Sequence, residues 1–183
     1  GRYLLAAGQA YPLKVYDIAT RALVTSFTGS GSREAVAVGA DGSLLIADYS
    51  GYVRRLAIND NGAVFDTGER CAMPGTNTRN VFLAPDGRTG VGITYTAMQS
   101  FVVSGMSAGD SRSVTNALGG VFSPQGDRFY LRTTTTVAAW EYNAGTGQFG
   151  AAPIYTFGAA TAIGYYGVDQ LDISPDGSKL YVS

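Results

Sequence analysis

Short runs of alternating apolar and small or polar residues recur along the chain, each interrupted by a tight-turn sequence. The pattern is an apolar run, a turn rich in Pro, Asp and Gly, and a second β-rich run. Its four copies are residues 35–47, 81–88, 121–131 and 171–182. Short runs bounded by turn residues are typical of strands. No segment has a sustained apolar period of 3.6 residues, so we predict no helix.

The turn glycines give the repeat its length. They are Gly42, Gly87, Gly126 and Gly177, spaced 45, 39 and 51 residues apart. This is about the size of one four-stranded propeller blade. In such a turn Pro fixes the first corner and Gly takes the left-handed position that closes the hairpin. The sequence therefore predicts an all-β fold, a β-propeller of about four blades with four antiparallel strands each.

The repeat also predicts how the chain divides. We expect a partial blade holding second to fourth strands at 1–32, blades at 33–78, 79–118 and 119–167, and a partial blade at 168–183. In the blade at 79–118 we place the third strand at 101–104 and the fourth at 111–115.

Both ends of the chain are then second strands, which bears on the size of the ring. A seven-bladed ring would need roughly 315 residues. We therefore expect a piece of a seven- or eight-bladed ring, with a self-closing four-bladed ring and a ring completed by another copy as alternatives. Open blade edges at the two ends would favour self-association.

Two segments carry a family resemblance. Ser-Pro-Asp-Gly-Ser-Lys-Leu-Tyr-Val-Ser at 174–183 and Leu-Lys-Val-Tyr-Asp-Ile-Ala-Thr at 13–20 resemble the YVTN-type propeller repeat of bacterial and archaeal surface and periplasmic proteins. The repeat also resembles the lactonase-like propellers. The resemblance implies the fold, and an extracellular, cell-surface or periplasmic location, but propellers host many functions.

Composition removes several kinds of chemistry. The chain has no His, which excludes Ser-His-Asp and Cys-His mechanisms and the usual zinc ligands. Lactonase-like sites generally use His, so the resemblance of this chain to the lactonase-like propellers is weakened. Quinoprotein propellers repeat a Trp-centred docking motif, whereas Trp140 is the only Trp here. No phosphate-binding loop is present. We therefore expect no cofactor.

Charge and hydropathy restrict the partners. The net charge is −1 and Arg residues are scattered, so nucleic-acid binding, which needs clustered positive charge, is not expected. No run of 18 apolar residues is present, and we expect no membrane span. Cys71 is the only Cys and we interpret it as an inert thiol, with a disulfide to a partner as the alternative. Residues 59–62 and Asp66 offer oxygen ligands, but calcium needs about six to eight, so we interpret them as an ordinary turn and expect no metal site.

What remains is the funnel-shaped face of a propeller. It is built from the loops that lead into each inner strand and those that join second to third strands. Aromatic residues and Arg are favoured in recognition patches. The polar and aromatic residues in these loops, our candidate ligand-binding residues, are Arg33, Glu34, Asp48, Tyr49, Arg79, Asn80, Tyr95, Tyr165, Tyr166 and Asp169.

These residues support three hypotheses. The first is a non-catalytic binding or structural module that holds a protein or glycan on this face. The second is a lactonase-like hydrolase that uses carboxylate and Arg groups there. The third is a structural subunit of an extracellular assembly. The alternative role for every candidate residue is to cap a strand end and to pair with a neighbouring blade.

Overall fold

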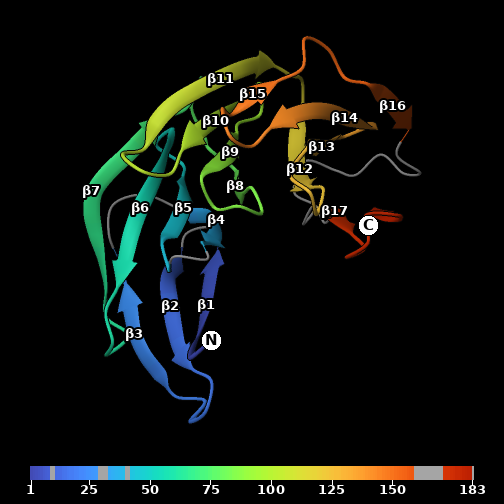
Figure 1. Cartoon of the computed structure of the whole chain (residues 1–183). Coiled ribbons are helices and arrows are strands. Elements are labelled where there is room, and N and C mark those ends of the chain that lie inside the picture. Colours follow the sequence, from blue (N-terminus) through green and yellow to red (C-terminus); the bar gives the residue numbers. More distant parts are fainter. Residues whose placement is uncertain (9–10, 29–32, 40–41, 159–170, 183) are drawn as a thin grey trace.

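The chain forms an arc of antiparallel sheets. The structure is a computed structural model, and it describes residues 1–8, 11–28, 33–39, 42–158 and 171–182. Every regular element in these residues is a strand, as predicted. Figure 1 shows the sheets following one another around the arc in chain order. The described residues contain no helix that is long and apolar enough to cross a membrane.

The first three sheets each follow the chain strand by strand. The first sheet is β1 (Tyr3–Gly8), β2 (Tyr11–Asp17) and β3 (Leu23–Phe27). The second sheet is β4 (Arg33–Val38), β5 (Leu44–Asp48), β6 (Tyr52–Ile58) and β7 (Val64–Ala72). The third sheet is β8 (Asn80–Leu83), β9 (Thr89–Ile93), β10 (Ala97–Val102) and β11 (Ser107–Ser113).

The remaining two sheets differ in strand number. The fourth sheet is β12 (Ala117–Phe122), β13 (Arg128–Thr133) and β14 (Thr136–Asn143), with both β15 (Gln148–Phe149) and β16 (Tyr155–Gly158) paired to β14. The fifth sheet is the two-stranded pair β17 (Leu171–Ile173) and β18 (Leu180–Val182).

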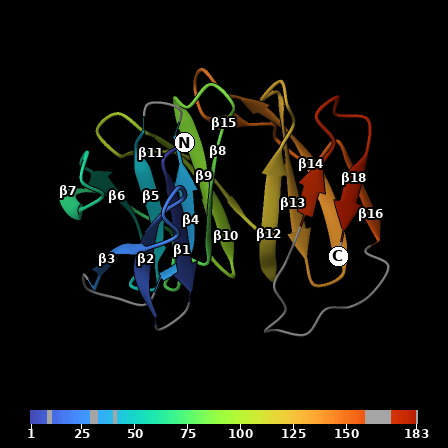
Figure 2. The ribbon, with the colours of Figure 1, turned by 90° about the horizontal axis from the view of Figure 1, so that it is seen from below.

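The first strands of the second to fifth sheets lie along the concave side of the arc (Figure 1). Each contacts the next, β4 against β8, β8 against β12 and β12 against β17. In the view from below, β4, β8 and β12 stand upright (Figure 2). Sheets that radiate from a ring of inner strands and pack face to face define a propeller-like architecture. The predicted fold class is therefore confirmed.

The turns that revealed the repeat fold as their residues require. Gly87 has φ of 70° and Gly177 has φ of 73°, a left-handed conformation that Gly adopts without steric cost. The Gly87 N–H donates to the carbonyl of Ala84 at 2.9 Å, and the Gly177 N–H donates to that of Ser174 at 2.8 Å. These bonds close the turns between first and second strands at one end of the arc's axis.

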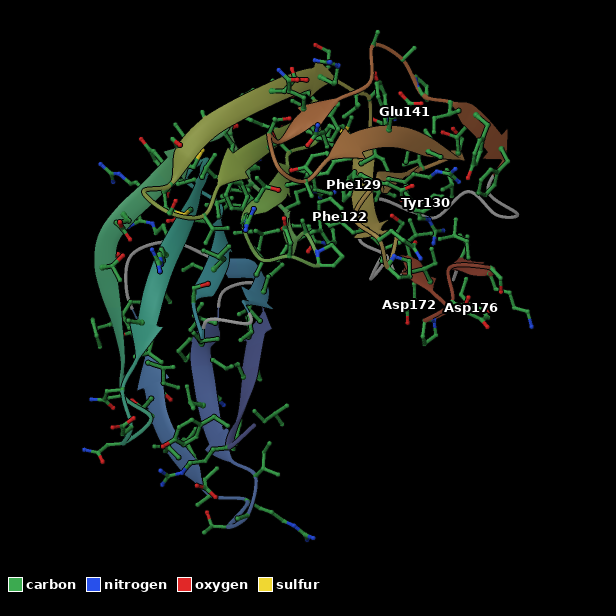
Figure 3. The ribbon with its side chains drawn as sticks, in the orientation of Figure 1. Phe122, Phe129, Tyr130, Glu141, Asp172 and Asp176 are labelled. Atoms are coloured by element: carbon green, nitrogen blue, oxygen red, sulfur yellow. The ribbon has the colours of Figure 1, made fainter. Side chains whose placement is uncertain are left out.

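The hydrophobic core lies between neighbouring sheets, as the side chains of the fourth sheet illustrate. Phe129, three residues after Gly126, is the cross-strand partner of Trp140. Both pack in one buried cluster with Val91 of the third sheet. The Phe122 and Phe129 rings are 4.9 Å apart. Figure 3 shows these two rings on one side of the fourth sheet and Tyr130 on the other, where Tyr130 packs toward β17 and β18.

Two predicted strands of the third sheet were misplaced. The third strand is Ala97–Val102 instead of 101–104, and the fourth is Ser107–Ser113 instead of 111–115. The reason is a tight turn that begins earlier than expected. The Thr94 hydroxyl accepts the N–H of Ala97 at 3.1 Å, and the Thr94 N–H donates to the carbonyl of Ala97 at 2.8 Å. The chain therefore reverses directly after β9.

Candidate functional site

Three loops at one end of the arc's axis form a continuous surface. They are the β5–β6 turn, the β7–β8 loop and the β9–β10 turn. The Met73 N–H donates to the carbonyl of Gly51 at 2.9 Å, and the Asn77 N–H donates to that of Tyr49 at 3.1 Å. The Thr94 hydroxyl donates to the carbonyl of Pro74 at 3.1 Å. Backbone bonds thus fix the β7–β8 loop between the two turns.

The close approach of two loops in this surface depends on glycine. Gly51 has φ of 89°, and a Cβ atom there would lie 3.0 Å from the carbonyl oxygen of Gly75. A side chain at position 51 would therefore push the β5–β6 turn away from the β7–β8 loop.

An arginine and two tyrosines dominate the side chains of this surface. The Arg79 guanidinium lies over the Tyr95 ring, with 5.4 Å between Cζ and the ring centroid. Both residues are half-buried, and Tyr49 is 44% exposed. The backbone N–H of Arg79 donates to the carbonyl of Ile93 at 2.8 Å. We call Tyr49, Arg79 and Tyr95 the loop-face cluster.

Asp48 has a different role from its neighbour Tyr49. Its side chain is fully buried. It accepts the N–H of Ser50 at 2.8 Å and forms an ion pair with Arg54. Arg54 also contacts Asp66, with 3.3 Å between Nη1 and Oδ2. The Asp48 carboxylate therefore holds the β5–β6 hairpin, through an ion pair within its own sheet.

A left-handed asparagine occurs in both described loops that lead from an outer strand to the next inner strand. Asn77 has φ of 64° and Asn116 has φ of 57°. Asn tolerates this conformation better than most residues. In the second loop the Ala117 N–H donates to the carbonyl of Tyr95 at 3.3 Å, much as Asn77 donates to Tyr49. These asparagines were not among our sequence candidates. An Asn shortly before an inner strand could have indicated a left-handed turn there.

The other candidates are only partly placed. The backbone of Arg33 pairs with that of Asp48 at the start of β4. This places Arg33 and Glu34 at the same end of the arc's axis as the loop-face cluster. Their side chains lie outside the described residues. Tyr165, Tyr166 and Asp169 also lie outside the described residues.

Asn80 faces the concave side of the arc, in an open depression of about 540 Å³. The wall consists of the inner strands and their turns, and it is mostly apolar. The residues that define it include Val36, Val38, Phe82, Val121, Ile173 and Pro124. This wall was not among the candidate sites predicted from the sequence.

The oxygen-rich segment at 59–62 forms an ordinary turn. The Asn59 side-chain oxygen accepts the N–H groups of Asn61 and Ala63 at 3.0 and 2.9 Å. The Tyr3 hydroxyl donates to the carbonyl of Asp60 at 2.6 Å. Within the described part of the chain, no group of three or more Cys, Asp or Glu side chains is arranged to hold a metal.

Cys71 is a buried core residue beside Val53 and Met73. Burial raises the pKa of its thiol, an effect that the Gln99 amide partly offsets. The thiolate, which is the reactive form, is therefore disfavoured.

Comparison with known proteins gives the fold and not the function. No model of a known protein family matches the chain. A search of curated proteins finds no significant match. Two solved structures are similar. A functionally unknown protein from Desulfotomaculum acetoxidans has a TM-score of 0.88 and 20% identity, over 100% of this chain and 62% of that one. A protein from Lactobacillus plantarum has a TM-score of 0.78 and 17% identity, over 98% and 60%.

The chain thus spans about three fifths of the length of each of these two proteins. At such low identity the likeness concerns the backbone alone. Any ligand must therefore be argued from the side chains of this chain.

Proposed function

We propose that this chain is part of a propeller that acts as a non-catalytic binding module, with its ligand on the loop-face cluster. The observation that carries the proposal is the Arg79–Tyr95 stack beside the exposed ring of Tyr49. Three loops present these side chains, and backbone hydrogen bonds hold the loops in place. The surface is therefore preorganised, which lowers the entropic cost of binding.

The chemistry of the cluster suits a polar ligand, either a protein segment or a glycan. Tyrosine rings offer a flat apolar face with a hydroxyl at the edge. Arginine supplies several N–H donors and a fixed positive charge that matches carboxylates. We expect ligands with a carboxylate near a ring or an apolar group.

The finer family assignment belongs to this proposal. The YVTN-type and lactonase-like resemblances both fit the propeller-like fold. We favour a YVTN-type repeat in an extracellular, cell-surface or periplasmic protein, in a ring of seven or eight blades. The absence of His weighs against the lactonase-like hydrolase, since it removes the commonest general base.

A binding screen tests the proposal. The purified chain would be applied to an array of neutral and carboxylate-bearing oligosaccharides and to a displayed peptide library. Any hit would then be measured with Tyr49→Ala and Arg79→Ala. Matched controls are Phe65→Ala, an exposed aromatic residue on β7, and Arg88→Ala, an exposed arginine in the β8–β9 turn.

The result expected is a ligand whose affinity falls roughly tenfold or more in each cluster variant, because hot-spot residues cost more than about 1.4 kcal/mol. The controls should bind normally. A ligand whose affinity ignores both cluster variants would overturn the site. Hydrolysis of a lactone panel by the wild-type chain would overturn the non-catalytic assignment.

A further inference from the structure

A second arginine is stacked on a tyrosine beside the loop-face cluster. The guanidinium of Arg70 lies over the ring of Tyr52, with 4.7 Å between Cζ and the ring centroid. Tyr52 is the first residue of β6 and directly follows the β5–β6 turn, which carries Tyr49. Arg70 lies on β7, the outer strand of the second sheet, and this sheet has a neighbouring sheet on each side (Figure 1). The stack therefore adjoins the loop-face cluster through one short turn.

We infer that Arg70, held by Tyr52, is a second carboxylate-binding residue, and that the ligand of this surface is an acidic glycan with more than one carboxylate. The inference rests on the proposed function, because it extends the same binding surface. Arg79 would bind one carboxylate and Arg70 another. The exposed ring of Tyr49 would pack against a sugar ring of the same ligand.

The charges of the β6–β7 hairpin leave Arg70 available for a ligand. Both acidic side chains of β7 contact arginines of β6. Oδ2 of Asp66 lies 3.3 Å from Nη1 of Arg54. Oε2 of Glu69 lies 3.2 Å from Nη1 of Arg55. The side chain of Arg70 has no ion pair or hydrogen bond with another residue that the structure describes, so its donors are open to a ligand.

Stacking fixes the guanidinium and leaves its N–H groups accessible. The ring lies against the flat face of the guanidinium, whereas the N–H donors point outward in its plane. These donors match the two oxygens of a carboxylate. Arg70 is exposed and Tyr52 is half-buried, so the ring is anchored in the sheet while the cation reaches solvent. An arginine that is already ordered loses less conformational entropy on binding than a mobile one.

The arginine directly opposite Arg70 in the sheet has a different role. Arg54 is the cross-strand partner of Arg70, and its Cζ lies 5.9 Å from the centroid of the Tyr52 ring. Its side chain is largely buried and is paired with Asp48 and Asp66. Arg54 therefore supports the hairpin, and of these two arginines Arg70 is the one that a ligand can reach.

The surroundings of Arg70 favour a glycan over a peptide. A sugar ring has an apolar C–H face that packs on an aromatic ring, and a uronic acid adds a carboxylate at its edge. An exposed tyrosine ring near two arginines suits this combination. Peptides are often held along a strand edge. The edge of β7 is interrupted, because its pairing register shifts between Arg54 and Leu56, opposite Gly68, which has φ of 82°. Such a bulge hinders the addition of a strand.

Calorimetric titration with oligomers of galacturonic acid and of glucuronic acid, from the monomer upward, gives the test. We expect affinity to rise with length until an oligomer reaches both arginines. Arg70→Ala should then weaken the binding of long oligomers roughly tenfold or more, because it removes charge-assisted hydrogen bonds. The same substitution should leave the monomer, which has one carboxylate, bound at the loop-face cluster as in wild type. Arg88→Ala, at an exposed arginine in the β8–β9 turn, should bind every oligomer like wild type.

Tyr52 acts as a positioning residue, and two substitutions separate its ring from its hydroxyl. Tyr52→Phe keeps a ring beneath Arg70 and should bind long oligomers like wild type. Tyr52→Leu removes the aromatic face and should weaken their binding severalfold, although Arg70 is still present. Circular dichroism checks that each variant is folded. Equal losses in the two variants would overturn the role of the ring.

The outcomes separate this inference from the proposed function. Binding that Arg79→Ala weakens and Arg70→Ala leaves unchanged at every oligomer length overturns the inference and leaves the loop-face cluster intact. Binding that only Arg70→Ala weakens supports the Arg70 subsite and overturns the loop-face cluster. A polyglutamate peptide that binds as tightly as the oligomers, and with the same dependence on Arg70, overturns the assignment to a glycan. Failure of all the uronic-acid oligomers to bind also overturns the inference, whereas the proposed function is still decided by the binding screen.

Discussion

The guanidinium of Arg79 lies over the ring of Tyr95, 5.4 Å from Cζ to the ring centroid. Arg79 precedes the inner strand of the third sheet, and Tyr95 lies in the turn between the second and third strands of that sheet. The contact therefore joins the start of the inner strand to the β9–β10 turn, at the end of the arc's axis where the β5–β6 turn and the β7–β8 loop also lie. The same pair orders the loops locally and forms the charged, flat surface to which we assign the proposed ligand.

Replacing Arg79 separates these two roles. A cation–π pair at a partly exposed site is worth about 0.5–1 kcal/mol, so the loss of this stack in Arg79→Ala should lower the free energy of unfolding by about that amount. Its effect on ligand affinity should be larger than that. Urea denaturation measures the first quantity, and Arg88→Ala is the control. A loss of several kcal/mol on unfolding would show that Arg79 is chiefly structural.

Asp48 is expected to be structural, unlike Tyr49 beside it. Asp48→Ala leaves Arg54, which is only 14% exposed, without its buried partner. Removing one member of a buried ion pair costs about 3 kcal/mol or more. The Asp66 carboxylate, 3.3 Å from Arg54, would offset part of this loss. Asp66 is 35% exposed, so Asp66→Ala should cost under about 1 kcal/mol. Equal effects of the two substitutions in urea denaturation would contradict this assignment.

Gly120 tests the close packing of β12 against β13 within the fourth sheet. A Cβ atom there would lie 2.4 Å from Cζ of Phe129 and 2.9 Å from the carbonyl oxygen of Tyr130. The backbone contact cannot move easily, so Gly120→Ala should cost about 1–3 kcal/mol by overpacking. Gly158→Ala, where no atom lies within 4 Å of the added carbon, should change stability by less than about 0.5 kcal/mol. Thermal unfolding of both variants checks the difference, and a neutral Gly120→Ala would refute the packing described here.

Tyr142 makes stability sensitive to high pH. Burial raises the pKa of its hydroxyl to about 12 in the folded chain, against about 10 in an unfolded one. The folded state therefore favours the neutral form. Its contribution is complete below pH of about 10 and is lost as the pH rises toward about 12. Tyr142→Phe should lose less stability than wild type across this range, as measured by urea denaturation at several pH values. Identical alkaline curves would contradict the assignment.

The turn sequences explain why so much of the fold could be predicted. Gly87 and Gly177 have positive φ angles, which Gly adopts without steric cost. The spacing of such turn glycines therefore gives the length of the repeat. The third sheet was harder to predict, because the turn after β9 is made by the Thr94 side chain and has no Gly or Pro. The apolar alternation around Ala97 does not distinguish a turn from a strand.

The site was less predictable than the fold. Position in a loop was enough to nominate Tyr49, Arg79 and Tyr95. It could not show that Asp48 is buried, because that depends on Arg54 across the hairpin. An Asp and an Arg on the two sides of a tight turn do, however, indicate that an ion pair can form across the hairpin. The stacking of Arg79 on Tyr95 depends on the curvature of the loops, which no sequence pattern encodes.

The most direct test of the loop-face cluster is a set of amide spectra of the isotope-labelled chain, recorded during titration with a carboxylate-bearing oligosaccharide or peptide from the binding screen. The proposal predicts shift changes concentrated at residues 49–51, 74–80 and 94–96, and abolished by Arg79→Ala. Changes confined to the opposite turns around Gly87 and Gly126, with the loop residues silent, would contradict it.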